Sequence, residues 1–173
     1  RLIRVVGVHT GWPGLEEPLL EAPLFVAENP AVNQPPARPF AAYAVSGYFG
    51  YEMGTEEFAP DVIGWIGQDD AANRMATALR RGSLKELVTD VWPYHAGVAK
   101  RYGMDMVMYE GGTHVAGHEV WADNEDLTAF FIAFNYSDEM AQLYAELLAA
   151  WRKAGGTLFN AFVDVSKPSK WGS

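Results

Sequence analysis

Four short apolar runs, separated by longer stretches with helical periodicity, set the pattern of the chain. The runs cover residues 2–8, 41–50, 104–109 and 157–163, and their β-branched and aromatic residues are typical of strands. Strands that alternate with helical segments indicate a parallel sheet with right-handed crossovers. The pattern therefore predicts an α/β fold with four parallel strands and outer helices.

The longest predicted helix lies between the second and third strands. Ser83 with Glu86 three positions later matches a capping box and predicts the start of this helix. Pro93 should kink or restart it, and Gly103 should end it. We expect His95, which lies on the apolar face, to be a core histidine with satisfied hydrogen bonds. Apolar or aromatic residues share that face at spacings of three and four: Leu84, Leu87, Val88, Val91, Val98, Ala99 and Tyr102.

The other connections are read in the same way. The segment up to residue 28 is broken by Pro18 and Pro23, so at most a short, irregular helix fits there, and residues 29–39 must form a loop because they contain four prolines. Residues 61–67, 71–81 and 127–134 are predicted helices. A further helix should run from a Ser137 cap to about residue 153.

The third strand leads into a carboxylate, two glycines and a histidine. Five of its residues 104–110 are apolar or aromatic, and this density predicts burial on both faces. Glu110 then falls where the strand ends, and Gly111 and Gly112 would allow a turn and the close approach of another group. Glu110 is therefore either a buried carboxylate held by a salt bridge or backbone amides, or a functional group.

Polar and aromatic residues recur where the predicted strands end. They are His9, Trp12, Tyr48, Glu110, His114 and Asp164. The carboxyl ends of parallel strands meet at one edge of a sheet, which is where α/β folds bind their ligands. The sequence therefore predicts a ligand site at this edge.

Composition narrows the class of ligand. The length of 173 residues corresponds to a single domain, and the 13 Lys and Arg against 22 Asp and Glu give a net charge of −9. That balance argues against a nucleic-acid partner, which would require a cationic face. The absence of cysteine excludes disulfides and thiolate metal sites. No apolar run approaches the ~20 residues that span a membrane, so we expect no membrane partner.

Three segments resemble a known enzyme family. They are AAYAVSGYFG (41–50), MVMYEGGTH (106–114) and LFNAFVDVSKPSKWGS (158–173). They resemble the C-terminal half of a clan A (β/α)8-barrel glycoside hydrolase, in particular large bacterial proteins described loosely as cellulose-binding or hypothetical. The resemblance covers essentially the whole chain but half of that fold, so residues 1–173 would form one half-barrel with strands five to eight. The abrupt ends, at Arg1 and Ser173, also indicate an excerpt of a longer polypeptide.

The resemblance implies roles for several residues. Glu110 would be the nucleophile, and Tyr48 would be the aromatic residue near the end of strand six. Substrate contacts would come from His9, Trp12, Tyr48, His114, Asp164 and Trp171. The general acid/base of the family, an Asn-Glu pair after strand four, would lie in the missing half. We interpret the sole pair here, Asn124-Glu125, as a helix cap.

Each of these residues also has a simpler interpretation. His9 and His114 could be loop histidines that bond a carbonyl, and Trp12 could cover the rim of the barrel. Asp164 could form a salt bridge or turn contact with Lys167 or Lys170. His114, His118 and Glu119 form no complete metal pattern, so no metal and no cofactor are expected.

Three functions remain open at this point. The first is a retaining glycoside hydrolase acting on a polysaccharide or oligosaccharide, complete only with its other half, so the fragment alone would be inactive. The alternatives are a non-catalytic carbohydrate-binding barrel and a self-pairing structural half-barrel. The expected partners are a carbohydrate and either the missing N-terminal half-barrel or a second copy of the chain. The compartment stays open, with secretion as the candidate.

Overall fold

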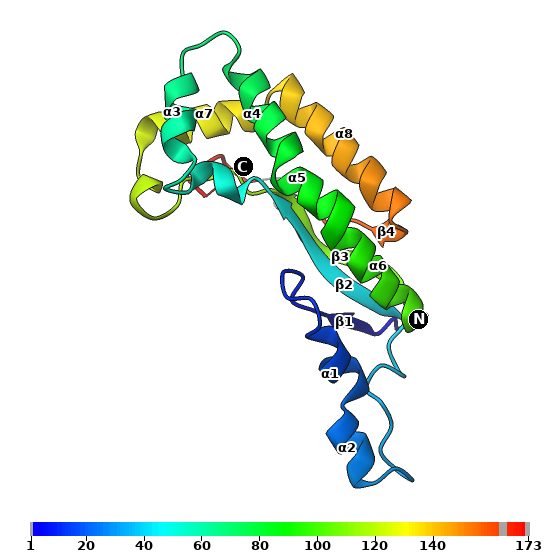
Figure 1. Ribbon diagram of the computed structural model, residues 1–173. Coiled ribbons are helices and arrows are strands. Elements are labelled where there is room, and N and C mark those ends of the chain that lie inside the picture. Colours follow the sequence, from blue (N-terminus) through cyan, green and yellow to red (C-terminus); the bar gives the residue numbers. More distant parts are fainter. Residues whose placement is uncertain (1, 163–165, 172–173) are drawn as a thin grey trace.

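The protein forms an α/β fold around one parallel sheet. The computed structural model describes residues 2–162 and 166–171 (Figure 1). The strands are β1 (Val5–Gly7), β2 (Ala42–Phe49), β3 (Asp105–Thr113) and β4 (Gly156–Leu158). All neighbours pair in parallel, in the order β1-β2-β3-β4. The predicted four-stranded parallel sheet is therefore confirmed, although the first and last strands are shorter than the sequence indicated.

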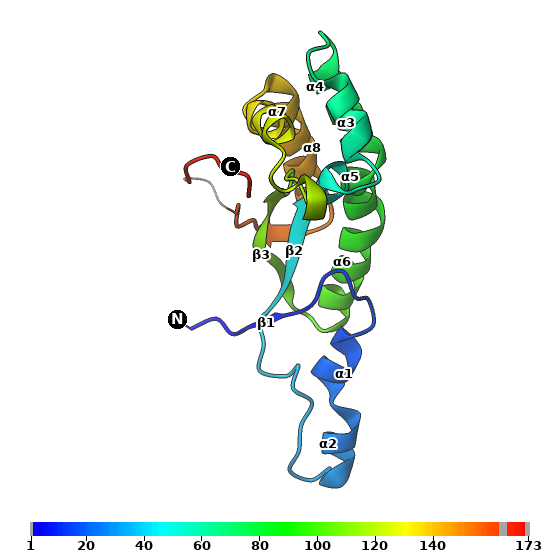
Figure 2. The same cartoon turned by 90° about the vertical axis from the view of Figure 1, so that its left-hand side faces the viewer.

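Three helical crossovers connect the strands (Figures 1 and 2). The first contains α1 (Glu16–Glu21) and α2 (Pro23–Glu28). The second contains η1 (Tyr51–Gly54), α3 (Ala59–Trp65), α4 (Ala71–Arg81), α5 (Ser83–Glu86), the π-helical turn η2 (Leu87–Val91) and α6 (Trp92–Arg101). The third contains η3 (Glu119–Trp121), α7 (Glu125–Asn135) and α8 (Asp138–Lys153). None of the described helices is long and apolar enough to cross a membrane.

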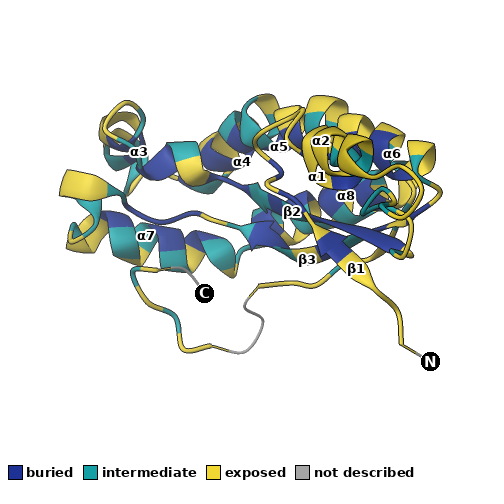
Figure 3. Ribbon diagram, turned by 90° about the horizontal axis from the view of Figure 1, so that it is seen from below, coloured by how far each residue is buried: buried dark blue, intermediate teal, exposed yellow. Residues whose placement is uncertain are grey.

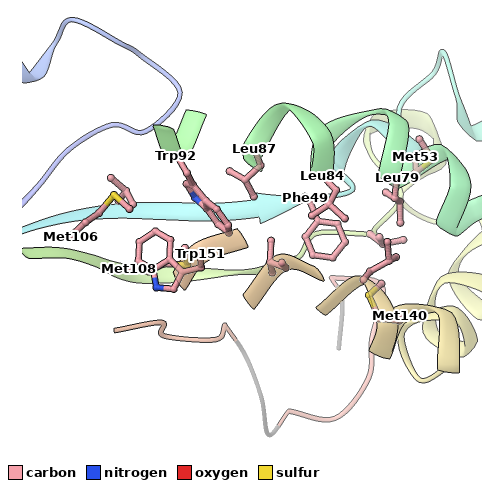
Figure 4. Close-up of a cluster of buried hydrophobic side chains, with 14 of the residues drawn as sticks. Phe49, Met53, Leu79, Leu84, Leu87, Trp92, Met106, Met108, Met140 and Trp151 are labelled. Atoms are coloured by element: carbon pink, nitrogen blue, oxygen red, sulfur yellow. The ribbon is translucent and has the colours of Figure 1, made fainter. Parts of the chain in front are cut away.

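The core lies between the helices and one face of the sheet. Met106 and Met108 of β3 are buried on that face, next to Trp92 of α6 and Trp151 of α8 (Figure 4). The two indole rings meet edge to face, with centroids 5.1 Å apart. The apolar face predicted for residues 84–102 contributes Leu84, Leu87, Val98 and Ala99 to this core, so the helical periodicity of that segment was interpreted correctly, although Trp92 was not assigned to the face.

The opposite face of the sheet is open, which corrects the expectation that β3 is buried on both faces. Tyr109 is exposed and Val107 is half-buried, whereas Met106 and Met108 are buried. Leu158 and Phe162, on and after β4, are 59% and 55% exposed. Figure 3 shows exposed residues beside buried ones along β1. An apolar run marks a strand, but it does not show whether a second layer covers the strand.

Glu110 lies inside β3 and not at its end, because the strand continues to Thr113. The register with β2 shifts at Tyr109, so Val45 pairs with Met108 and Ser46 pairs with Glu110. Gly111 does not form the predicted turn. A Cβ at Gly111 would come within 2.4 Å of the Met108 sulfur and 2.8 Å of the Gly47 carbonyl oxygen. Glycine is needed there because β2 and a side chain approach closely.

The helix starts were predicted with mixed success. Asn124 and Ser137 cap α7 and α8, accepting hydrogen bonds from Leu127 N (2.8 Å) and Met140 N (3.2 Å). Ser83 is not a cap, because it is the first residue of α5 and its hydroxyl accepts from the backbone N–H of Gly50 at 2.8 Å. The Ser83 N–H donates instead to the Glu52 carboxylate at 2.9 Å.

The boundaries around Pro93 and Gly103 follow the sequence. Pro93 lies in the first turn of α6, directly after the π-helical turn η2, so the helical segment continues through this position and changes its hydrogen-bond pattern just before the proline. Gly103 follows α6 with a φ of +65°, a conformation that suits glycine.

Candidate functional site

The carboxyl ends of the parallel strands lie at one edge of the sheet, as the topology requires. His9 follows β1, Tyr48 is near the end of β2, and Glu110 lies in the second half of β3. Asp164 lies outside the described residues, so its predicted place on this edge stays a prediction.

Glu110 and Tyr48 form the centre of the candidate site. Tyr48 is one residue beyond the register partner of Gly111, and both Tyr48 and Glu110 are half-buried. The Tyr48 phenol faces the Glu110 carboxylate and interacts with its charge. Burial, followed by the charge of Glu110, raises the pKa of Tyr48 well above its ordinary value. The phenol therefore stays protonated at neutral pH and presents a donor toward the carboxylate.

An aromatic and imidazole cluster continues the site beyond β3. His114 lies 5.5 Å from Tyr48, 5.6 Å from Tyr51 and 5.6 Å from His118, measured between ring centroids. Tyr51 stacks on His118 at 3.9 Å. Phe162 approaches Tyr48 from the β4 side, with ring centroids 6.3 Å apart. We name these five residues the rim cluster. Its members come from the end of β2 and the turn after it, from the segment after β3 and from the segment after β4.

The imidazoles of the rim cluster favour the neutral form. Desolvation by the surrounding rings lowers the pKa of His114, although much of its side chain still reaches solvent. Desolvation and the neighbouring His114 lower the pKa of His118, against smaller opposing effects of the Tyr51 backbone and Glu119. Neutral imidazoles both donate and accept hydrogen bonds, which suits hydroxyl-bearing ligands.

A metal centre has no support in the described part of the chain. No group of three or more His, Asp or Glu side chains there could hold a metal ion. His114 and His118 contact one another and two tyrosines.

His9 and Trp12 form a second aromatic pair on the loop after β1. Their rings meet edge to face, with centroids 6.2 Å apart, and Trp12 is 64% exposed. The main chain turns between them, where Trp12 N donates to the His9 carbonyl at 3.0 Å. This pair lies across β2 from Glu110, since β2 separates β1 from β3.

Trp171 has different surroundings from those expected. Lys170 lies over its ring, 4.8 Å from the centroid, and the same ammonium forms an ion pair with Asp123 ahead of α7. The described contacts therefore connect the C-terminal segment to α7 and do not connect Trp171 to Glu110. Lys170, one of the two partners suggested for Asp164, is bound to Asp123.

A buried polar network fixes the loop after β1. His95, fully buried, contacts the Tyr43 hydroxyl through Nδ1 (2.7 Å) and the Thr10 carbonyl oxygen through Nε2 (2.9 Å). A carbonyl can only accept, so Nε2 carries the proton, and Nδ1 of the neutral ring accepts from Tyr43. The prediction that His95 is a satisfied core histidine is confirmed.

Several residues of this edge were not singled out from the sequence. Glu16 is 4% exposed and accepts from Gly14 N (3.2 and 3.0 Å) and from the Tyr94 hydroxyl. Tyr51 belongs to the rim cluster. Glu16 follows another polar turn and shows no local motif, so no pattern in the sequence marks it. Tyr51 could have been noticed as an aromatic residue directly after the second strand.

An open groove of about 640 Å³ lies beside Tyr51 and does not include Glu110. Its charged lining is mixed, with Arg81 and Lys85 against Glu52, Glu86 and Asp90. Mixed charges without a buried, unpartnered group do not define a ligand, so we assign no role to this groove.

No protein-family model, curated protein or solved structure matches this chain.

Proposed function

We propose that this chain is the nucleophile-bearing half of a retaining glycoside hydrolase with a (β/α)8 barrel. Glu110 is the nucleophile, and the substrate is a polysaccharide or oligosaccharide. The second carboxylate, which acts as acid and then as base, comes from the half of the barrel that completes the sheet. This proposal extends the resemblance of the three sequence segments to clan A enzymes.

The observation that carries the proposal is the place of Glu110 on the open sheet face, where the Tyr48 phenol faces it. A nucleophilic carboxylate has to be ionised, oriented and accessible. The protonated Tyr48 hydroxyl supplies a donor that orients the Glu110 carboxylate. The rim cluster surrounds the pair with aromatic faces and neutral imidazoles, which suit the apolar faces and hydroxyl groups of sugars.

The architecture also supports half of a barrel. Neighbouring strands follow one another in chain order, all in parallel, with the apolar core on the helix side. A TIM barrel has this sequential order and places its catalytic residues at the carboxyl ends of the strands. The net charge of −9 favours an uncharged ligand such as a glycan over a polyanion.

The proposed reaction assigns one step to this chain. A Glu110 carboxylate oxygen bonds to the anomeric carbon while the glycosidic C–O bond breaks. The leaving oxygen takes its proton from the second carboxylic acid, which must lie ~5–5.5 Å from Glu110 in a retaining enzyme. Water, deprotonated by that same residue, then releases the sugar.

Covalent labelling tests the nucleophile directly. The purified protein is incubated with 2,4-dinitrophenyl 2-deoxy-2-fluoroglycosides of several common sugars. Dinitrophenolate leaves without a proton, so the first step does not require the acid. The fluorine slows hydrolysis, so the glycosyl-enzyme accumulates. Peptide mass mapping should place the added sugar on Glu110, and Glu110→Gln should prevent labelling.

The matched control is Glu57→Gln, which changes an exposed carboxylate in the turn that precedes α3. It should leave labelling unchanged. Label on another carboxylate, or label that persists in Glu110→Gln, would overturn the assignment. Oligosaccharide binding without labelling by any glycoside would favour a non-catalytic carbohydrate-binding barrel.

A further inference from the structure

We propose that Tyr94 and His95 of α6 are positioning residues, because they hold the loop His9–Gly14 in place. The held loop presents the Trp12 indole as a surface on which a sugar ring bound beside Glu110 can stack. This inference rests on the proposed function for its ligand. The positioning itself rests on hydrogen bonds within the described chain.

Two neighbouring residues of α6 anchor the loop on both sides of Trp12. On one side, His95 Nε2 donates to the Thr10 carbonyl oxygen at 2.9 Å, from a fully buried ring. On the other side, Tyr94 donates to Glu16, whose carboxylate also accepts from the backbone N–H of Gly14. Thr10 and Glu16 are themselves buried, at 7% and 4% exposed. The loop is therefore fixed at its ends although its tip is in solvent.

The anchored loop is also connected to the strand next to Glu110. Thr10 Oγ1 accepts from the Ser46 backbone N–H at 2.7 Å, and Ser46 is the register partner of Glu110. Adjacent strands lie ~4.8 Å apart, so Thr10 is about two strand spacings, ~10 Å, across the sheet from Glu110. The Trp12 loop and Glu110 therefore belong to the same carboxyl edge of the sheet.

An exposed indole on an otherwise fixed loop suits ligand stacking. Trp12 is 64% exposed and contacts His9 edge to face, so one large aromatic surface is presented with little freedom to lose on binding. Immobilising a side chain before the ligand arrives reduces the entropic cost of association. The buried hydrogen bonds of Tyr94 and His95 immobilise the loop in this way, although neither residue touches the ligand.

The chain offers a closely matched pair of variants. Tyr94→Phe removes the hydroxyl that holds Glu16. Tyr102→Phe removes a hydroxyl at the end of the same helix that donates at 2.8 Å to Glu21 of α1, away from the Trp12 loop. Both tyrosines are at least partly solvent-accessible, so both variants should fold, and thermal melting checks this.

The first readout is ¹⁹F NMR of protein labelled with 5-fluorotryptophan, with the Trp12 resonance assigned by Trp12→Phe. We expect Tyr94→Phe to shift or broaden this resonance and Tyr102→Phe to leave it unchanged. An unchanged Trp12 resonance in Tyr94→Phe, or equal changes in both variants, would overturn the positioning role.

The second readout is the kinetics of labelling by the dinitrophenyl fluoroglycoside. Tyr94→Phe should raise the half-saturating concentration about threefold to tenfold, as expected for one lost hydrogen bond. The maximal labelling rate should change less than about twofold, because the reacting groups are untouched. Trp12→Ala should act in the same direction, and an unchanged half-saturating concentration in Trp12→Ala would overturn the platform. Absence of any labelling would instead contradict the proposed function, so the two failures are distinguishable.

Discussion

At the scale of single residues, the approach of Tyr48 to Glu110 dominates the candidate site. Glu110 is half-buried within a strand, so its orientation depends on what its carboxylate contacts. The phenol of Tyr48 supplies a donor that remains protonated over the neutral range, because burial and the Glu110 charge raise its pKa.

Tyr48→Phe should slow covalent labelling at Glu110 by about tenfold to a hundredfold, because it removes the hydroxyl proposed to orient the carboxylate. The ring remains, so the contacts with His114 and Phe162 are kept. Labelling rates with the fluoroglycoside measure the effect. Tyr136→Phe, at an exposed position after α7, is the control and should label at the original rate. Equal rates for Tyr48→Phe and the unmodified protein would contradict the orienting role.

The buried imidazole of His95 makes stability depend on pH. Burial lowers its pKa below the ordinary value of 6.5, and the facing Thr10 carbonyl and Glu16 charge oppose this only partly. The other titratable groups facing it are Tyr43 and Tyr94. Below pH 6.5 the His95 imidazole is therefore more fully protonated in the unfolded chain than in the folded chain.

The free energy of unfolding should consequently rise with pH up to about 6.5 and then level off as far as His95 is concerned. Urea unfolding at a series of pH values between about 5 and 8 measures this. His95→Gln should reduce the slope, leaving the contributions of His114 and His118, whose pKa values are also lowered. An identical slope in His95→Gln would show that the ring does not titrate as its burial requires.

At the scale of elements, close approaches of the backbone decide where glycine is required. Gly54, at the end of η1, packs against the segment after β3: a Cβ there would lie 1.7 Å from the Ala116 carbonyl oxygen. His118 N also donates to the Gly54 carbonyl at 2.9 Å, so this contact holds the rim cluster in place. A Cβ at Gly97, inside α6, would meet no atom within 4 Å apart from its chain neighbours and the backbone of its own helix.

Alanine should therefore have opposite effects at these two glycines. Gly54→Ala should destabilise the fold by about 1–3 kcal/mol or more, because the obstructing atoms belong to the backbone. Gly97→Ala should stabilise it by about 0.5–1 kcal/mol, the difference between the two residues inside a helix. Denaturant unfolding of both variants gives the comparison. Similar stabilities for the two would mean that Gly54 does not make this close contact.

At the scale of the whole molecule, the open face of the sheet is the main feature that lowers stability, because it leaves apolar side chains in water. Ile3, Leu158 and Phe162 are 61%, 59% and 55% exposed, and both edge strands have three residues. Each large apolar side chain left in water forgoes ~1.5–3 kcal/mol, against a total stability of ~5–15 kcal/mol for a typical domain. Open strand edges also invite pairing with another chain.

We therefore expect this face to be covered, by the other half of the barrel or by a second copy of the chain. Sedimentation at low micromolar concentration should show association of the isolated chain. Phe162→Glu should weaken this association, whereas Leu24→Glu, at an exposed position of α2, should not. A compact, cooperatively folding monomer of 19.1 kDa would contradict the half-barrel architecture.

The sequence by itself indicated the four strands, the long helices and their order. Hydrophobic periodicity located the strands and the long helices, local capping chemistry located Asn124 and Ser137, and connection rules made the sheet parallel. These features depend on neighbours within a few residues. The same local reasoning correctly placed His95 in the core, because its helical face was apolar.

Only the tertiary structure decided which groups meet. Ser83 resembles a cap, yet it bonds Gly50, and the partner of Tyr94 is Glu16, 78 residues away. The register shift that places Glu110 inside β3 depends on pairing with β2. The open sheet face could not be predicted either. An apolar pattern indicates that a strand can be buried, but it does not indicate which segment covers it. Contacts between distant segments arise from packing, and local hydrophobic periodicity does not predict them.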